Sequence, residues 1–166
     1  MLRDTARDFG EVNELVIKPQ VSAGSDRTLR IALNSSSLST IESTSPMMIQ
    51  PFLESICSEE ELSVYIFGGK VSHSIVKHPA KNDFRAILIF GGHISTIHNP
   101  TDEMLNVIST RLTACPVHPI YARIDMARDN SGVLHVMELE IIEPFLCLHH
   151  ASGNGLSFVR VVLNEC

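Results

Sequence analysis

The chain has 166 residues, of which 44% are hydrophobic, and a formal net charge of −6. This length and apolar content suffice for one ordinary domain with a buried core. The 13 basic and 19 acidic residues are spread along the chain, so no basic stripe is available to follow a phosphate backbone. The composition therefore excludes nucleic acid as an expected partner.

The first twenty residues carry charges throughout and lack the apolar core of a signal peptide. No later segment approaches the roughly 20 consecutive apolar residues of a membrane-spanning helix. The sequence thus predicts a cytoplasmic protein without membrane contact. Its four cysteines lie far apart and form no CxxC pair, which indicates reduced, mainly structural thiols.

Strand signals dominate the first half of the chain. Residues 14–19 (ELVIKP) and 28–33 (TLRIAL) have strand character and flank a loop of small residues, QVSAGSDRT. The serine-rich stretch that follows is either a flexible connection or holds a short helix between Leu38 and Glu42. Together with the later segments, these patterns predict an α+β fold with mainly antiparallel sheets and few helices.

The middle of the chain predicts a hairpin, a strand and a helix. Two alternating segments, ELSVYIF and KVSHSIVKHP, flank Gly68 and Gly69, which suit a two-residue turn. DFRAILIF is predicted to be a strand. TDEMLNVISTRLTA is predicted to be a helix capped by Thr101, with an apolar stripe on its inner side. The stripe consists of Met104, Leu105, Ile108 and Leu112.

A second hairpin, YARIDMARDNSGVLHVMELEIIEP, carries acidic side chains in an unusual arrangement. If Asn130 and Ser131 form its tip, Arg123 lies opposite Glu138, and Tyr121 lies opposite Glu140. Side chains alternate along strands, so four charged residues share one face and apolar residues share the other. The charged set is Arg123, Asp125, Glu138 and Glu140, and the apolar set is Ala122, Ile124, Met126, Met137, Leu139 and Ile141.

Three carboxylates within diagonal reach repel one another, and one arginine cannot neutralise them all. A bound cation would compensate the cluster, and oxygen ligands without histidine or cysteine suit Mg²⁺ or Mn²⁺. Mg²⁺ on a few carboxylates usually shares its coordination shell with substrate phosphates, which points to a nucleotide. The alternative interpretation is a solvated outer face whose charges serve solubility.

Four segments together resemble the ATP-grasp ligases. They are LVIKPQVSAGSDRT, IQPFLESI, LSVYIFGGKVSHSIVKHPAKNDFR and the acidic hairpin, in that order. The likeness is to the glutathione-synthetase-like branch that includes the ATP-grasp enzyme of cycloserine biosynthesis, and it runs from about Glu14 to about His150. It implies an ATP-grasp-like fold in which a nucleotide is held between sheet layers.

The resemblance also assigns roles to individual residues. For the nucleotide it implies Lys18 and the loop residues Ser22 and Gly24 at the phosphates, Gln50 and Phe52 at the adenine, Glu61 at the ribose, and Lys77 at the phosphates. For catalysis it implies Arg85 and Arg123 near the transferred phosphoryl group, where positive charge is needed. For the metal it implies Asp125, Glu138 and Glu140 as ligands of Mg²⁺ or Mn²⁺.

The implied activity is ATP-dependent ligation: ATP phosphorylates a small-molecule carboxylate, and an amine-type nucleophile attacks the acyl phosphate. Residues 1–150 would form a partial ATP-grasp domain that lacks the N-terminal substrate region, supplied by a missing half of the protein or by a homo-oligomer. Residues 151–166 would be a divergent tail, in which LSFVRVVL is either a strand or a sequence foreign to the family. The apolar AILIF after Arg85 favours the alternative of a catalytically inactive remnant that binds nucleotide or protein.

Overall fold

The computed structural model describes residues 8–10, 12–34, 41, 44–58, 61–81, 83–86, 90–97 and 100–165. The short helix predicted between Leu38 and Glu42 lies almost entirely outside these residues. The chain divides into two compact units, Met1–Leu53 and Glu54–Cys166, and each is described by itself. Both units are built on antiparallel sheets, as the sequence predicted for an α+β fold.

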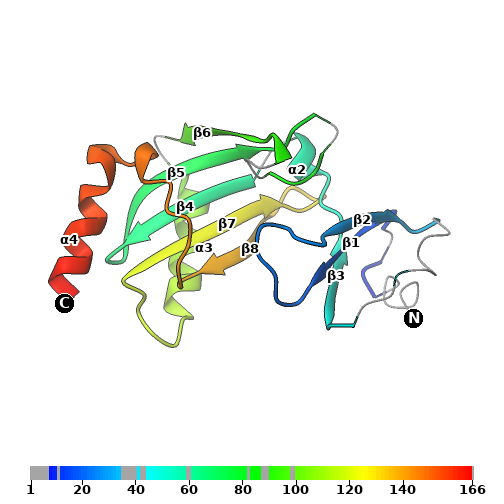
Figure 1. The fold of residues 1–166 in the computed structure, drawn as a ribbon, viewed down its shortest axis with the longest axis horizontal. Helices are drawn as coiled ribbons and strands as arrows, with labels where there is room; N and C mark the ends of the chain where they lie inside the picture. Colours follow the sequence, from blue (N-terminus) through cyan, green and yellow to red (C-terminus); the bar gives the residue numbers. More distant parts are fainter. Residues whose placement is uncertain are drawn as a thin grey trace. The chain divides into compact units, whose positions relative to one another are not determined.

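The first unit contains a three-stranded antiparallel sheet in the order β2-β1-β3 (Figure 1). Its strands are β1 (Glu14–Pro19), β2 (Leu29–Ala32) and β3 (Met47–Pro51). The central strand β1 pairs on both sides, and its apolar Leu15 and Ile17 are almost completely buried. The predicted strand at residues 14–19 is therefore confirmed as the core strand of this unit.

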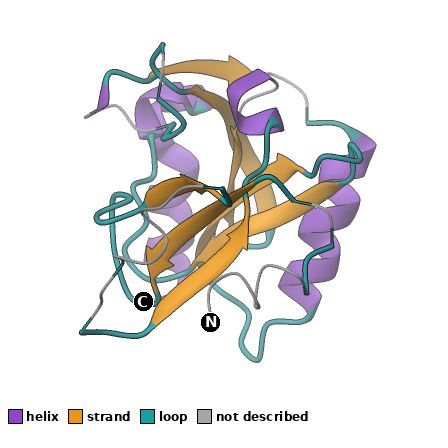
Figure 2. Cartoon of the chain, turned by 90° about the vertical axis from the view of Figure 1, so that its right-hand side faces the viewer, coloured by secondary structure: helices purple, strands orange, loops and turns teal. Residues whose placement is uncertain are grey.

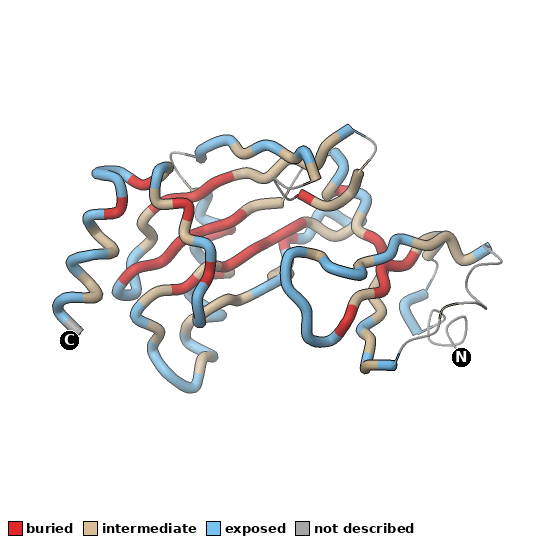
Figure 3. Tube along the Cα trace, in the orientation of Figure 1, coloured by how far each residue is buried: buried red, intermediate tan, exposed pale blue. Residues whose placement is uncertain are grey.

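The second unit contains a five-stranded antiparallel sheet in the order β6-β5-β4-β7-β8. The strands are β4 (Glu61–Phe67), β5 (Lys70–His78), β6 (His93–Ile97), β7 (Tyr121–Arg128) and β8 (Leu134–Glu140). A short helix, α2 (Ser55–Ser58), precedes β4. The inner strands of the sheet carry most of the buried positions (Figure 3), because both of their edges are paired and one of their faces packs in a hydrophobic core.

The β4–β5 hairpin turns at Gly68 and Gly69, as predicted. Both glycines have positive φ, 56° and 74°, which is the requirement of a two-residue type I′ turn. A Cβ atom added to Gly68 would lie 3.1 Å from Cγ2 of Val161, so a side chain there would also crowd Val161.

One face of the five-stranded sheet packs against α3 (Asp102–Thr113), which lies behind the strands in Figure 1. The predicted cap is confirmed, because Oγ1 of Thr101 accepts a hydrogen bond from the backbone N–H of Met104. Met104 and Ile108 are buried in this core, but Leu105 is 39% exposed, so its place in the stripe was wrong. Val107 packs against the core instead.

The C-terminal segment crosses the opposite face of the sheet at one end, and α4 (Leu156–Glu165) follows it (Figures 1 and 2). Of the two alternatives for LSFVRVVL, the strand was wrong, because this segment is helical. Phe158 and Val161, one helical turn apart, pack against the cluster around Phe67, which favours a helix over the strand preference of the valines. Among the described residues no helix is both long and apolar enough to cross a bilayer.

The described part of DFRAILIF is also not a strand. Oδ1 of Asp83 accepts hydrogen bonds from the backbone N–H groups of Phe84 at 2.7 Å and of Arg85 at 2.9 Å. These N–H groups would be needed for a strand ladder, so the local side-chain bonds replace strand pairing. Residues 87–89 of this segment lie outside the described residues.

The β7–β8 hairpin has a different register from the predicted one. Its turn is longer, because Oδ1 of Asp129 accepts from the N–H groups of Ser131 and Val133 and stabilises a five-residue loop. A bulge beside Asp125 then shifts the pairing once more. Asp125 therefore lies opposite Glu138, and Arg123 lies opposite Glu140.

The two shifts add to two residues at the charged end of the hairpin, so all four charged side chains stay on one face. Near the turn the observed pairing differs from the predicted one by only one residue. There the side chains of β8 point to the opposite face from the predicted one. Leu134 and Val136 pack against the core, whereas Met137 has no partner in the register.

Candidate functional site

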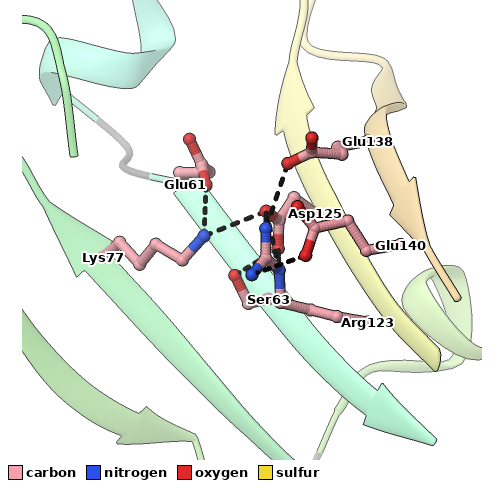
Figure 4. A network of polar contacts seen from close by, with 7 residues as sticks. All are labelled: Glu61, Ser63, Lys77, Arg123, Asp125, Glu138 and Glu140. Carbon is pink, nitrogen blue, oxygen red and sulfur yellow. Dashed lines mark hydrogen bonds and ion pairs between the residues drawn. The ribbon is translucent and has the colours of Figure 1, made fainter. Parts of the chain in front are cut away.

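A cluster of charged side chains occupies the face of the five-stranded sheet that α3 does not cover (Figure 4). The strand register brings the cluster together. Glu61 on β4 pairs with Lys77 on β5, and Ser63 on β4 pairs with Asp125 on β7. Directly paired residues point to the same side of a sheet, so residues distant in sequence meet here. We call this set the acidic cluster: Glu61, Ser63, Lys77, Arg123, Asp125, Glu138 and Glu140.

Asp125 is the buried centre of the acidic cluster, with only 3% of its surface exposed. Its Oδ1 accepts a hydrogen bond of 2.6 Å from Oγ of Ser63 and one of 3.1 Å from Nε of Arg123. Its Oδ2 accepts from Nζ of Lys77 at 3.0 Å. A buried carboxylate is stable only when charged or polar donors surround it, and three side chains supply them here.

Arg123 bridges the carboxylates of β7 and β8. Its Nη2 lies 3.0 Å from Oδ2 of Asp125 and donates to Oε2 of Glu138 at 3.0 Å. Its Nη1 lies 3.0 Å from Oε2 of Glu140. Burial opposes the positive charge, but Asp125 and Glu140 outweigh this effect and raise the pKa of Arg123 above its usual range.

Lys77 joins Glu61 to the buried centre. Its Nζ donates to Oε1 of Glu61 at 2.6 Å and to Oδ2 of Asp125 at 3.0 Å. Burial opposes its charge, yet these two carboxylates raise the pKa of Lys77. Burial also raises the pKa of Glu61, against the attraction of Lys77. Lys77 and Glu61 are therefore poorly solvated, and each charge is stabilised by the other.

Four carboxylates and two cations give the acidic cluster a formal charge of −2 when all are ionised. An oxygen-only donor set with this excess charge has the chemistry that Mg²⁺ requires. Burial, together with the neighbouring Glu138 and Asp125, raises the pKa of Glu140 against the opposing charge of Arg123. Among the described residues, however, no three His, Cys, Asp or Glu side chains form a ready metal-binding group. In this arrangement Lys77 and Arg123 compensate the carboxylates.

Arg85 lies outside this network. Among the described contacts it pairs with Asp83, with Nη2 2.8 Å from Oδ2, and its guanidinium lies 3.5 Å from the ring centroid of Phe90. The hydrogen bond from Arg85 holds the pKa of Asp83 well below its usual range. No described contact joins Arg85 to Arg123, the other predicted catalytic arginine.

In the first unit, the register places Lys18 and Gln50 on the same face of the three-stranded sheet. Phe52 is 4% exposed, and the guanidinium of Arg30 lies 3.7 Å from its ring centroid. Arg30 also forms a two-bond ion pair with Glu14. The ring of Phe52 is therefore part of the packing of this unit.

The predicted phosphate loop contains consecutive left-handed residues. Gly24 and Ser25 have φ of 62° and 56°, and Oγ of Ser22 donates to the carbonyl oxygen of Asp26 at 3.1 Å. Successive residues of unusual backbone conformation can turn several N–H groups toward one anion. Ser22 and Gly24 are both exposed.

The chain was compared with protein families, curated proteins and solved structures. No protein-family model matches the chain. The cycloserine biosynthesis protein DcsG of Streptomyces lavendulae is 25% identical, over 97% of this chain and 58% of that protein. The crystal structure of D-cycloserine synthetase DcsG matches with a TM-score of 0.80 at 22% identity, covering 99% of this chain and 59% of that one.

A RiPP-associated ATP-grasp ligase of Chryseobacterium gregarium, solved with ADP and a leader and core peptide, matches with a TM-score of 0.70 at 15% identity. The match covers 99% of this chain and 53% of that one. The chain has an ATP-grasp fold. The D-alanine–D-alanine ligase of Bacillus anthracis supports this with a TM-score of 0.63 at 19% identity, covering 96% of this chain and 54% of that one.

The chain spans somewhat more than half the length of these ATP-grasp proteins. The DcsG structure matches 99% of the chain, so the likeness extends into residues 151–166, beyond the limit of about His150 that the sequence suggested. The C-terminal segment is thus included in the ATP-grasp similarity.

Sequence reasoning missed Ser63 as a member of the site. Its hydroxyl is completely buried and donates to Asp125, although the two residues are 62 positions apart. A serine in a strand of otherwise apolar residues, SVYIF, was the available signal, because a buried hydroxyl needs a partner. Its partner could not be named before the pairing of β4 with β7 was known.

Proposed function

We propose that this chain binds Mg²⁺ and ATP and acts as the nucleotide-binding part of an ATP-dependent carboxylate–amine ligase. ATP would phosphorylate a small-molecule carboxylate, and an amine-type nucleophile would attack the acyl phosphate, releasing phosphate. The observation that carries this proposal is the acidic cluster on one face of a sheet with an ATP-grasp fold.

Asp125, Glu138 and Glu140 would hold the metal, whose bound charge would neutralise the phosphates. Their oxygen-only chemistry and the excess charge of −2 support this role. The ATP-grasp ligase PsnB, with a TM-score of 0.64 at 16% identity, was solved with Mg and ADP. Mn²⁺ would be an alternative with the same ligand chemistry.

Arg123 and Arg85 would stabilise the charge that spreads over the transferred phosphoryl oxygens, and Lys77 would face the phosphates. In the first unit, Lys18, with Ser22 and Gly24 of the loop, would contact the phosphates. Gln50 and the backbone of Phe52 would contact the adenine, and Glu61 would contact the ribose. No protein nucleophile is needed, because alignment and charge neutralisation carry the reaction.

One observation favours a second candidate, a catalytically inactive ATP-grasp remnant that binds nucleotide or protein. Asp125 already pairs with Lys77 and Arg123, and no ready metal-binding group exists among the described residues. ATP consumption separates the two candidates. The ligase hydrolyses or transfers the terminal phosphate in the presence of its acid, whereas the remnant binds nucleotide without turnover.

The test is thermal unfolding of the chain with ADP, with and without Mg²⁺, in the wild type and in Glu138→Gln. A ligand at 100 times its Kd that binds only the folded state stabilises it by about 2.7 kcal/mol, so the wild type gains a Mg²⁺-dependent rise in Tm. Glu138→Gln loses this rise and keeps its ligand-free Tm, because 51% of the Glu138 side chain is exposed.

Glu103→Gln is the matched control. Glu103 is 47% exposed and also pairs with an arginine of β7, Arg128, but it lies on α3 away from the acidic cluster. This variant keeps the full response to Mg²⁺ and ADP. An equal response in the wild type and Glu138→Gln contradicts the metal assignment, and no response in the wild type contradicts the function.

A further inference from the structure

Arg123 contacts three carboxylates at once. Its guanidinium reaches Asp125 through Nε and Nη2, Glu138 through Nη2 and Glu140 through Nη1, at distances of 3.0 to 3.1 Å. Only 12% of the side chain is exposed. An arginine has five N–H donors in a fixed plane, and here they face three carboxylates at once.

These three carboxylates are the ones proposed to hold the metal. While the guanidinium bridges them, the described residues offer no group of three metal ligands. A divalent cation that takes the carboxylate oxygens now bonded to Arg123 has to displace those hydrogen bonds. The free energy of those charge-assisted bonds is subtracted from the free energy of metal binding.

We infer that Arg123 is an intramolecular counter-cation, which competes with the divalent cation for Asp125, Glu138 and Glu140 and couples metal binding to anion binding. The inference rests on the proposed function for the identity of the site. It assigns Arg123 a further role, in which the residue keeps the nucleotide-free acidic cluster closed to metal.

The buried centre does not depend on Arg123 alone. Asp125 keeps the hydroxyl of Ser63 at 2.6 Å and the ammonium of Lys77 at 3.0 Å when the guanidinium withdraws. Among the described contacts Glu138 and Glu140 have no such alternative donor, and their side chains are more exposed, at 51% and 31%. The exchange of Arg123 for a metal is thus centred on the two glutamates, with Asp125 held in place.

A displaced guanidinium has lost its carboxylate partners and gains most from a new anion, such as a phosphate. Metal and nucleotide then bind with positive coupling, and each raises the affinity of the protein for the other by the same factor. The wild type is expected to bind Mn²⁺ weakly without ADP and much more tightly with it. This coupling depends on the charge at position 123.

The experiment compares wild type, Arg123→Gln and Arg128→Gln, with Mn²⁺ as the probe. Mn²⁺ binding is measured by electron paramagnetic resonance without nucleotide and with ADP, and thermal unfolding is measured in chelator and in Mn²⁺. Without nucleotide, Arg123→Gln is expected to bind Mn²⁺ about tenfold more tightly than wild type or better, because the competing charge is gone. Its Tm is expected to fall in chelator and to recover with Mn²⁺.

Arg128→Gln is the matched control on the same strand. Arg128 pairs with Glu103 through two bonds, at 3.0 and 2.6 Å, and Glu103 lies outside the acidic cluster. Its replacement is expected to lower Tm without any recovery in Mn²⁺ and without a gain in Mn²⁺ affinity. Recovery specific to position 123 is a result that a purely structural arginine would not give.

If Arg123→Gln does not fold in chelator, Arg123→Lys replaces it. One ammonium cannot span three carboxylates, so this variant is expected to gain Mn²⁺ affinity by a smaller factor. The inference is overturned if the wild type binds Mn²⁺ with ADP but the variants show no gain in Mn²⁺ affinity without nucleotide. The proposed function still stands in that case. A wild type without Mn²⁺-dependent ADP binding, beside Arg123→Gln with tight Mn²⁺ binding, contradicts the proposed function and the coupling to anion binding, and supports the competition between Arg123 and the metal. No Mn²⁺ binding in any of the proteins overturns both.

Discussion

Oγ of Ser63 on β4 donates a hydrogen bond of 2.6 Å to Oδ1 of Asp125 on β7, directly across the strand pair. Both side chains are buried, with 0% and 3% exposure. Ser63 thus fixes the orientation of the carboxylate that Lys77 and Arg123 also contact. A side chain that holds a proposed metal ligand in one orientation contributes to binding without touching the metal.

Ser63→Ala is expected to lower the free energy of unfolding by about 1–2 kcal/mol, because Asp125 loses one buried donor and keeps two. The same variant is expected to weaken the Mg²⁺-dependent stabilisation by ADP. Urea unfolding with and without Mg²⁺ and ADP measures both effects.

Ser74→Ala is the control for this prediction. Ser74 on the neighbouring strand β5 is equally buried, but its hydroxyl has no hydrogen-bond partner among the described residues. Removing an unsatisfied buried hydroxyl is expected to leave stability unchanged or raise it slightly. Equal losses in the two variants would show that the bond to Asp125 contributes nothing specific.

Lys77→Met is expected to lower the free energy of unfolding by about 3 kcal/mol or more, because it leaves Glu61 and Asp125 buried without their shared cation. The loss depends on pH. Burial raises the folded-state pKa of Glu61, and removing Lys77 takes away the attraction that opposes this rise. The folded variant therefore binds a proton that the unfolded chain, with a glutamate pKa of 4.5, has released.

The sign follows from linkage: the stability of Lys77→Met rises as pH falls through the folded-state pKa of Glu61 toward 4.5. The double variant Lys77→Met with Glu61→Gln is expected to recover part of the stability at neutral pH and to lose this pH dependence. Urea unfolding of the three proteins across the acid range is the measurement. A single-variant profile parallel to that of the double variant would contradict the coupling.

The parts of the fold that sequence could predict were those set by local chemistry. Two glycines fixed the β4–β5 turn, Thr101 capped α3, and alternation put the charges of β7 and β8 on one face. The exact partners were wrong because the side chain of Asp129 lengthened the turn and a bulge beside Asp125 moved the pairing again. Turn chemistry of this kind is a side-chain effect that strand periodicity does not contain.

The other features that the sequence could not predict depend on the pairing of strands that are distant in the chain. Lys77 and Arg123 were each recognised, but their shared contact with Asp125 depends on the order β5-β4-β7, which the sequence does not state. For the same reason the sequence left LSFVRVVL as either a strand or a sequence foreign to the family, whereas residues 156–165 form a helix. Its valines favour strands locally, and packing of Phe158 against Phe67 decides the outcome.

Protonation of His73 is expected to lower the stability of the folded protein in acid. Its ring is stacked on Tyr65 with centroids 4.2 Å apart, and Nε2 lies 3.0 Å from the carbonyl oxygen of Leu146. Burial lowers its pKa below 6.5, despite the hydrogen bond to Leu146. As pH falls from 6.5, the unfolded chain takes up a proton before the folded protein does, so stability is lost until the folded-state pKa is passed.

The measurement is urea unfolding at about pH 7.5 and about pH 5.5, on either side of the ordinary histidine pKa. The replacement His73→Phe keeps the aromatic stacking and removes the titrating group. This variant is expected to lose less stability between the two values than the wild type. Part of the slope remains, because burial also lowers the pKa of His150, which lies close enough to His73 to affect it. Identical slopes in the two proteins would contradict the assignment.

The C-terminal helix is expected to be part of the folded unit. Phe158 packs against Phe67 and Tyr121, with ring centroids 5.3 and 5.6 Å apart, and therefore covers one end of the sheet face that also carries the acidic cluster. Phe158→Ala is expected to lower the free energy of unfolding by about 2–3 kcal/mol, somewhat less than for a completely buried phenylalanine. Urea unfolding is expected to show one cooperative transition.

Val159→Ala is the matched control, because the neighbouring side chain is 47% exposed and its loss is expected to change stability by no more than about 0.5 kcal/mol. Limited proteolysis adds a local measurement: Phe158→Ala is expected to expose residues 151–166 to cleavage at conditions where the wild type and Val159→Ala resist. If Phe158→Ala proved as harmless as its control, the helix would be an appendage whose contacts with Phe67 and Tyr121 carry no folding energy. A large loss instead assigns the tail to the same cooperative unit as the proposed site.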